Sequence, residues 1–104
     1  MSRKPGDLII KDPSADEPQG FDWTDYLAEL GASITIQTST WTLSGPDAVL
    51  TKHDPAILTG SLKTQIYLAA GTTGSRYTLT NRIVTTSSPA VTDERSFDVL
   101  VQDR

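Results

Sequence analysis

Two alternating runs within residues 75–102 constrain the fold of this chain more than any other feature. In the first run, three apolar residues share one parity: Tyr77, Leu79 and Ile83. In the second run, the apolar parity holds Phe97, Val99 and Val101. Alternation of period two, rich in aromatic and β-branched residues, is typical of half-buried antiparallel strands. The sequence therefore predicts a long β-hairpin around which shorter strands are arranged.

Shorter segments before this hairpin also read as strands. Ile34 and Ile36 are even-numbered, whereas Trp41 and Leu43 are odd-numbered, so one strand needs a β-bulge near residues 37–40. We expect short strands at residues 48–52 and 56–59 with a break at 53–55, and a further strand at residues 62–68. Turn residues recur about every 10 positions, a spacing typical of β-sandwiches. The predicted fold class is all-β.

The start of the last hairpin refines this prediction. Tyr77 follows the glycine-rich corner at residues 71–75, which is the tyrosine-corner position of immunoglobulin-like sandwiches. Trp41 is the expected large core aromatic residue. We therefore predict a small immunoglobulin-like β-sandwich of about seven strands at residues 19–104. An extended N-terminal arm at residues 1–18 is expected to precede it.

Three prolines and many charges interrupt the first 20 residues, so no regular element is expected to run through them. Only one apolar group stands out there: Leu8, Ile9 and Ile10. Two interpretations stay open for this segment. It is either a frayed polar terminus, or an extended piece that docks along a sheet edge or a neighbouring subunit.

Residues 21–31 concentrate aromatic side chains. The pattern predicts a short strand through Phe21 and Trp23, then a helical turn that Thr24 caps and Gly31 ends. The aromatic patch either closes one end of the sandwich or offers a binding surface. Together with the N-terminal triplet it supplies the candidate partner-binding residues: Leu8, Ile9, Ile10, Trp23 and Tyr26.

The composition offers little to catalytic or cofactor chemistry. The chain has no cysteine and a single histidine, His53, so thiolate sites and histidine clusters are excluded. Asp93 and Glu94 are adjacent on a predicted strand and would point to opposite faces, so they do not form a carboxylate pair. The loop at residues 71–75 lacks the lysine of a phosphate-binding loop. We expect no enzyme activity, no catalytic residue, no metal and no cofactor.

Charge and hydropathy argue against two classes of partner, nucleic acids and membranes. The net charge is −4, and residues 1–29 carry seven acidic but only three basic residues. The sequence has no basic stripe for phosphates and no apolar run of membrane-spanning length, so neither nucleic acid nor membrane is an expected partner. The first residues also lack the apolar stretch of a signal peptide, which predicts synthesis and retention in a cytoplasm.

The sequence also predicts the contacts of two side chains in the first strand of the hairpin. Asn81 interrupts the apolar parity, so its amide is expected to be buried and to bond to backbone groups or face a gap. Pairing Ile83 with Phe97 would place Arg82 opposite Asp98 as a cross-strand ion pair.

Four segments in this order resemble one family of small tailed-bacteriophage virion proteins, the fiber-tail adaptor type: FDWTDYL, STWTL, GTTGSRYTLTNRIVTT and TDERSFDVLVQ. The similar segments span about residues 7–103 and are strongest over Gly71–Val101. The resemblance implies a non-enzymatic structural protein that links tail or collar proteins to a fiber. It also implies several copies per particle in the tail region of the virion, synthesis in the host bacterial cytoplasm, and phage tail, collar or fiber proteins as partners.

A second hypothesis is a carbohydrate-binding or adhesive β-sandwich module. It requires exposed aromatic rings, such as those of Trp23, Tyr26 or Tyr67, that stack on sugars. The chain has two tryptophans, three tyrosines and two phenylalanines, and a core of this size needs most of them.

Overall fold

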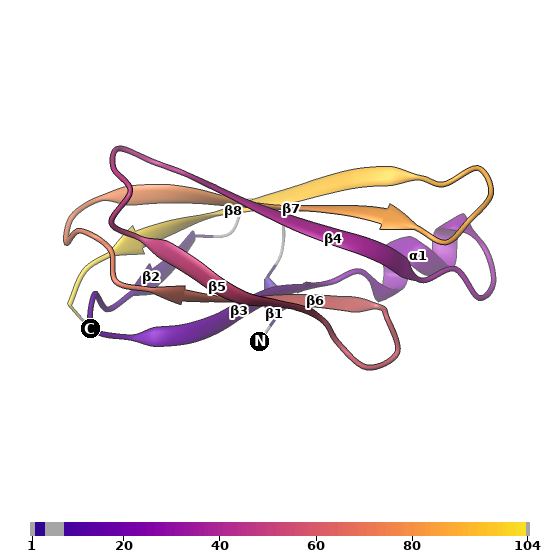
Figure 1. The fold of residues 1–104 in the computed structure, drawn as a ribbon, viewed down its shortest axis with the longest axis horizontal. Helices are drawn as coiled ribbons and strands as arrows, with labels where there is room; N and C mark the ends of the chain where they lie inside the picture. The colour runs from indigo at the N-terminus through magenta and orange to yellow at the C-terminus, as the bar shows by residue number, and fades with distance from the viewer. Residues whose placement is uncertain (1, 4–7, 104) are drawn as a thin grey trace.

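The computed structural model describes residues 2–3 and 8–103, which form two facing β-sheets and one short helix (Figure 1). The first sheet has four strands in the order β1 (Ser2–Arg3), β3 (Asp16–Asp22), β6 (Lys63–Ala69), β5 (Thr51–Ile57). The second sheet has the order β2 (Leu8–Lys11), β8 (Thr92–Val101), β7 (Arg76–Thr85), β4 (Ile36–Ser44). The predicted all-β sandwich is confirmed, and the immunoglobulin-like part of the prediction stays a prediction.

The predicted hairpin is formed by β7 and β8, which pair antiparallel along their whole length. Its apolar parity faces the core as expected. Six of its side chains are buried there: Tyr77, Leu79, Ile83, Phe97, Val99 and Val101. These residues line one wall of the hydrophobic core between the sheets.

The expected register of this hairpin was wrong. Leu79, and not Ile83, lies opposite Phe97, so Arg82 faces Glu94. Asp98 instead pairs with Arg76, whose Nη2 lies 2.8 Å from its carboxylate. Alternation fixes which face a residue occupies, but a shift by an even number of residues leaves that face unchanged. The pattern could therefore predict the buried face without predicting the partner.

Aromatic rings from both sheets meet in the core. The ring of Phe21 stacks on Trp41 at 6.1 Å between centroids and meets Phe97 edge-on at 5.2 Å. Full burial of side chains of this size stabilises a fold by about 1.5–3 kcal/mol each. Trp41 is 6% exposed, so its expected core position is confirmed.

The slip in hydrophobic parity along β4 has the predicted cause. The pairing of β4 with β7 shifts between Ile36 and Thr38, which inserts Gln37 as an extra residue. Ile36 and Trp41 can then both be buried, although their numbers differ in parity.

Two strands expected at residues 48–52 and 56–59 are in fact one strand, β5. The pairing of β5 with β6 shifts between His53 and Ala56, and Asp54 has a φ of 52°. The break therefore appears as an irregularity inside the strand. Pro55 is tolerated because, among the described strands, β5 has β6 as its only neighbour and so lies at the sheet edge.

The expectation that no regular element runs through residues 1–20 is also wrong. Leu8–Lys11 forms β2, which pairs in parallel with β8 at a sheet edge, and β3 begins at Asp16. The boundary expected after residue 18 therefore lies inside β3. At Pro18 the only described neighbour of β3 is β6, and a strand with one free side tolerates the missing N–H of proline.

Helix α1 (Thr24–Leu30) follows β3 and lies at one end of the sandwich, which measures 43 × 22 × 19 Å (Figure 1). Gly31 ends the helix, as predicted. Thr24 is not the N-cap, however, because Trp23 occupies that position. The carboxylate of Asp22 accepts a hydrogen bond from the Thr24 N–H at 2.9 Å, which satisfies one donor that the helix start leaves free.

Candidate partner-binding site

The apolar residues of β2 divide between the core and the solvent. Ile9 is 4% exposed, whereas Leu8 and Ile10 are 47% and 42% exposed. Ile10 lies beside the half-buried Leu100 of β8. Leu8, Ile10 and Leu100 together form an apolar strip, here called the β2 strip, on the outer face of the sheet at its edge. Exposed apolar side chains that gather in this way mark interaction surfaces more often than isolated ones.

A buried lysine holds β2 in place. Lys11 is fully buried, and its Nζ donates hydrogen bonds to the carbonyl oxygens of Ala70 at 2.7 Å and of Asp12 at 2.9 Å. The Gln102 N–H donates to the Lys11 carbonyl at 2.9 Å. A buried ammonium is stable only when it is hydrogen-bonded, so these contacts fix the end of β2 against the sandwich. The β2 strip is thus displayed on a fixed strand.

The aromatic residues near α1 close one end of the core. Trp23 is 0% exposed, and the guanidinium of Arg95 lies 4.2 Å from its ring centroid and 5.5 Å from that of Tyr26. Burial, followed by the nearby Asp93 carboxylate, raises the pKa of Tyr26. Trp23 therefore cannot stack on a sugar in this fold, which removes the main support for the carbohydrate-binding hypothesis.

The amide of Asn81 connects the two sheets. Its Oδ1 accepts hydrogen bonds from Trp23 Nε1 at 3.1 Å and from Thr64 Oγ1 at 2.7 Å. Its Nδ2 donates to Ser39 Oγ at 2.8 Å and to the Thr40 carbonyl at 3.2 Å. The residue is buried as expected, but most of its partners are side chains and not backbone groups. All these bonds are internal, so Asn81 has a structural role.

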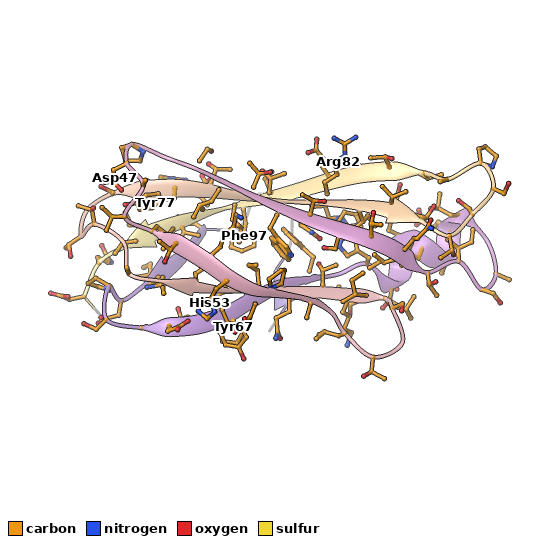
Figure 2. All side chains as sticks on the ribbon, in the orientation of Figure 1. Asp47, His53, Tyr67, Tyr77, Arg82 and Phe97 are labelled. Carbon is orange, nitrogen blue, oxygen red and sulfur yellow. The ribbon has the colours of Figure 1, made fainter. Side chains whose placement is uncertain are left out.

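His53 belongs to a small charged cluster that the sequence did not reveal. Its Nε2 lies 2.7 Å from Asp16 Oδ1, its Nδ1 lies 3.2 Å from Asp54 Oδ2, and its ring stacks on Tyr67 at 5.4 Å (Figure 2). Hydrogen bonds that the His53 imidazole donates to the carboxylates of Asp16 and then Asp54 raise the pKa of His53. Asp16 is 37 residues away in sequence, so no local motif could predict the contact. The cluster ties β5 to β3 across β6.

At the end of the sandwich away from α1, Tyr77 joins two loops (Figure 2). Its hydroxyl donates to Asp47 Oδ1 at 2.6 Å and accepts a hydrogen bond from the Thr72 N–H at 3.1 Å. The hydrogen bond from Tyr77 is the main reason why the pKa of Asp47 is lowered. Tyr77 thus bonds back to the glycine-rich corner, as its position in the sequence indicated.

Over residues 2–3 and 8–103, no three histidine, aspartate or glutamate side chains come together as metal ligands. No helix within the same residues is long and apolar enough to cross a membrane.

This sequence matches a known protein family. The sequence pattern described as podophage GP4 fiber-tail adaptor protein gp77 matches residues 11–100, which is most of the chain. The chain belongs to the gp77 fiber-tail adaptor family. The comparison with curated proteins found no match. The family membership confirms the resemblance found in the sequence, and it indicates a structural adaptor of the phage tail and not a class of enzyme.

In this gp77 family member the five candidate residues fall in two separate places. Leu8, Ile9 and Ile10 lie on β2, and Trp23 and Tyr26 lie at the α1 end. Ile9 and Trp23 are buried within the chain, whereas Leu8 and Ile10 are exposed and Tyr26 is half-buried. The most exposed candidate residues are therefore Leu8 and Ile10 of the β2 strip.

Proposed function

We propose that this protein is a non-enzymatic structural component of a phage particle that connects tail or collar proteins to a fiber. The match to the gp77 family over residues 11–100 is the observation that carries this proposal. Several copies act in each particle, because tail assemblies repeat their subunits about an axis. The protein is made in the cytoplasm of the infected bacterium and resides in the tail region of the virion. Neither nucleic acid nor membrane is among its partners.

The β2 strip is the surface that we assign to a tail, collar or fiber protein. Leu8 and Ile10 expose nearly half of their side-chain area, and burial of apolar area is the main source of affinity between proteins. Ile9 and Lys11 point inward and hold the strand, so the partner meets a preformed surface. Preformed surfaces lose less conformational entropy when they bind.

The proposal is tested by complementing a phage that lacks this gene. Particles are produced with the wild-type protein, with the double variant Leu8→Ser/Ile10→Ser, and with Val49→Ser as the matched control. Val49 is 48% exposed but lies in the loop after β4, and β4 and β2 are at opposite edges of their sheet. Circular dichroism and thermal melting confirm that each isolated variant folds.

We expect the wild-type protein and the Val49 variant in purified particles that carry fibers. The double variant should reduce the fiber content about tenfold, which corresponds to about 1.4 kcal/mol of lost binding. A wild-type protein that is absent from the particle would contradict the adaptor function. Full fiber content with the double variant would contradict the assignment of the β2 strip.

A further inference from the structure

The described strands at the sheet edges differ in how well they resist pairing with another chain. Pairing of another strand with β5 is hindered by Lys52, by the irregularity at Asp54 and by Pro55. β2 has four residues and ends at the buried Lys11, and β1 has two. β4 has nine residues and contains neither a charge nor a proline. Its bulge at Gln37 and the hydrogen bond from the Ile36 N–H to the Ser61 carbonyl concern only the start of the strand. Natural edge strands usually carry such protection, so β4 is open to an additional strand.

A trough runs beside this open edge, between β4 and β5. One hollow of about 250 Å³ is lined by Ser39 and Trp41 of β4, Lys52 and Pro55 of β5, and the core residue Ile66. A second hollow of about 470 Å³ also includes Lys52 and extends to the loop between the two strands. The sandwich is therefore hollowed along the same edge that lacks a neighbouring strand.

Two polar groups at this trough have no partner within the described residues. The indole Nε1 of Trp41 is buried without a hydrogen-bond acceptor. The ammonium of Lys52 is exposed and forms no ion pair with any described residue. A ligand that brings a carboxylate would match the exposed ammonium of Lys52.

We propose that the trough is the docking site for an extended segment of another virion protein that carries an acidic side chain. The segment adds as a strand to the free edge of β4 through main-chain hydrogen bonds. It places an apolar side chain in the hollow over Ile66, and its carboxylate pairs with Lys52. Strand addition of this kind obtains its affinity from the main chain and its specificity from side-chain pockets.

A second copy of this chain fits the site less well. Its own open edge, Ile36–Ser44, has no charged residue, so pairing β4 with β4 would bring no carboxylate to Lys52. The inference rests on the proposed adaptor function, because it needs a partner within the particle.

Photo-crosslinking in assembled particles tests the identity of the occupant. A photo-reactive residue replaces Thr40, which is exposed on β4 and lines the trough. The same residue at Thr92, exposed on β8, is the matched control. We expect a crosslink from position 40 to an acidic segment of another virion protein and none to that segment from position 92. A crosslink to a second copy, or no crosslink although the protein is in the particle, would overturn the proposal.

Charge reversal tests the role of Lys52. Lys52→Glu should lower the amount of this protein in purified particles about tenfold, whereas Lys52→Arg should leave it unchanged. Arg82→Glu makes the same change in charge on the outer face of β7, far from His53 and β5 (Figure 2), and should have no effect. Equal incorporation of the Lys52→Glu variant and the wild-type protein would refute the proposal. A wild-type protein missing from particles would instead refute the adaptor function itself.

Discussion

The indole N–H of Trp23 donates a hydrogen bond to Asn81 Oδ1 at 3.1 Å, joining residues 58 positions apart. Trp23 lies between the end of β3 and the start of helix α1, and Asn81 lies in the middle of β7. The bond therefore connects the two sheets. Both side chains are fully buried. Polar groups in such a core specify one arrangement of the layers, because any slip would leave them without partners.

Asn81→Ala should therefore be strongly destabilising. It removes the partner of several buried groups, each of which costs about 1–3 kcal/mol when left unsatisfied. We expect the free energy of unfolding in urea to fall by at least about 2 kcal/mol. Thr80→Ala is the control, since Thr80 bonds to Ser96 on the outer face of the sheet, and it should cost only the value of one hydrogen bond, about 0.5–1.5 kcal/mol. Equal effects of the two variants would contradict this role.

Trp41→Ala should cost about 3–5 kcal/mol of stability, as expected for a buried aromatic residue. The ring stacks on Phe21 and is 6% exposed. Trp41→Phe should cost much less, because the indole N–H makes no hydrogen bond within the described structure. Denaturant unfolding followed by circular dichroism measures both. A cost below about 1 kcal/mol for the alanine variant would show that Trp41 is not part of the core.

Gly20→Ala should destabilise the first sheet. Gly20 lies in β3 between β1 and β6, and a Cβ at this position would overlap the carbonyl oxygen of Thr64. Because the obstacle is backbone, it cannot rotate away, and overpacking of this kind costs about 1–3 kcal/mol. Thermal melting of the variant should show a clear decrease in Tm, whereas Thr92→Ala on the exposed face of β8 should not. An unchanged Tm would mean that the strands can separate to admit a methyl group.

The single histidine gives the protein a predictable response to pH. Asp16 and Asp54 raise the pKa of His53 above its ordinary value of 6.5. A raised pKa contributes stability that is fully present below the unfolded-state pKa and is lost as the pH rises through the folded-state pKa. We therefore expect stability to decrease from about pH 6 to about pH 8, and to decrease less in His53→Asn.

An NMR titration of His53 checks whether its raised pKa is the cause of this pH dependence. The imidazole of His53 should titrate above pH 6.5 in the wild-type protein. Asp16→Asn should move its pKa toward that ordinary value, because the hydrogen bond from His53 to the Asp16 carboxylate is the largest contribution. A wild-type pKa at or below 6.5 would contradict the cluster.

Local patterns predicted those parts of the fold that depend on side-chain alternation. The β7–β8 hairpin, the bulge before Trp41 and the end of α1 at Gly31 all follow from parity or from glycine. The pairing partner of Ile83 could not be predicted, because even shifts keep the same face buried. The strand through Pro18 was missed because proline is tolerated where one side of a strand is free.

The candidate site was predictable only in part. The triplet at residues 8–10 signalled an apolar segment, but only the pairing of β2 with β8 shows that Ile9 is buried and that its neighbours are exposed. The Trp23–Asn81 bond and the His53–Asp16 pair join residues distant in sequence. Contacts of this kind depend on how the two sheets are layered, which no local pattern encodes.

Helix α1 closes one end of the 43 Å sandwich, and the bond between Tyr77 and Asp47 closes the other. The two ends therefore present unlike chemistry to whatever lies beyond them. A subunit rotated end for end would present loops at the position where its neighbour contacts helix α1. A neighbour that binds the helix end therefore finds different contacts at the loop end.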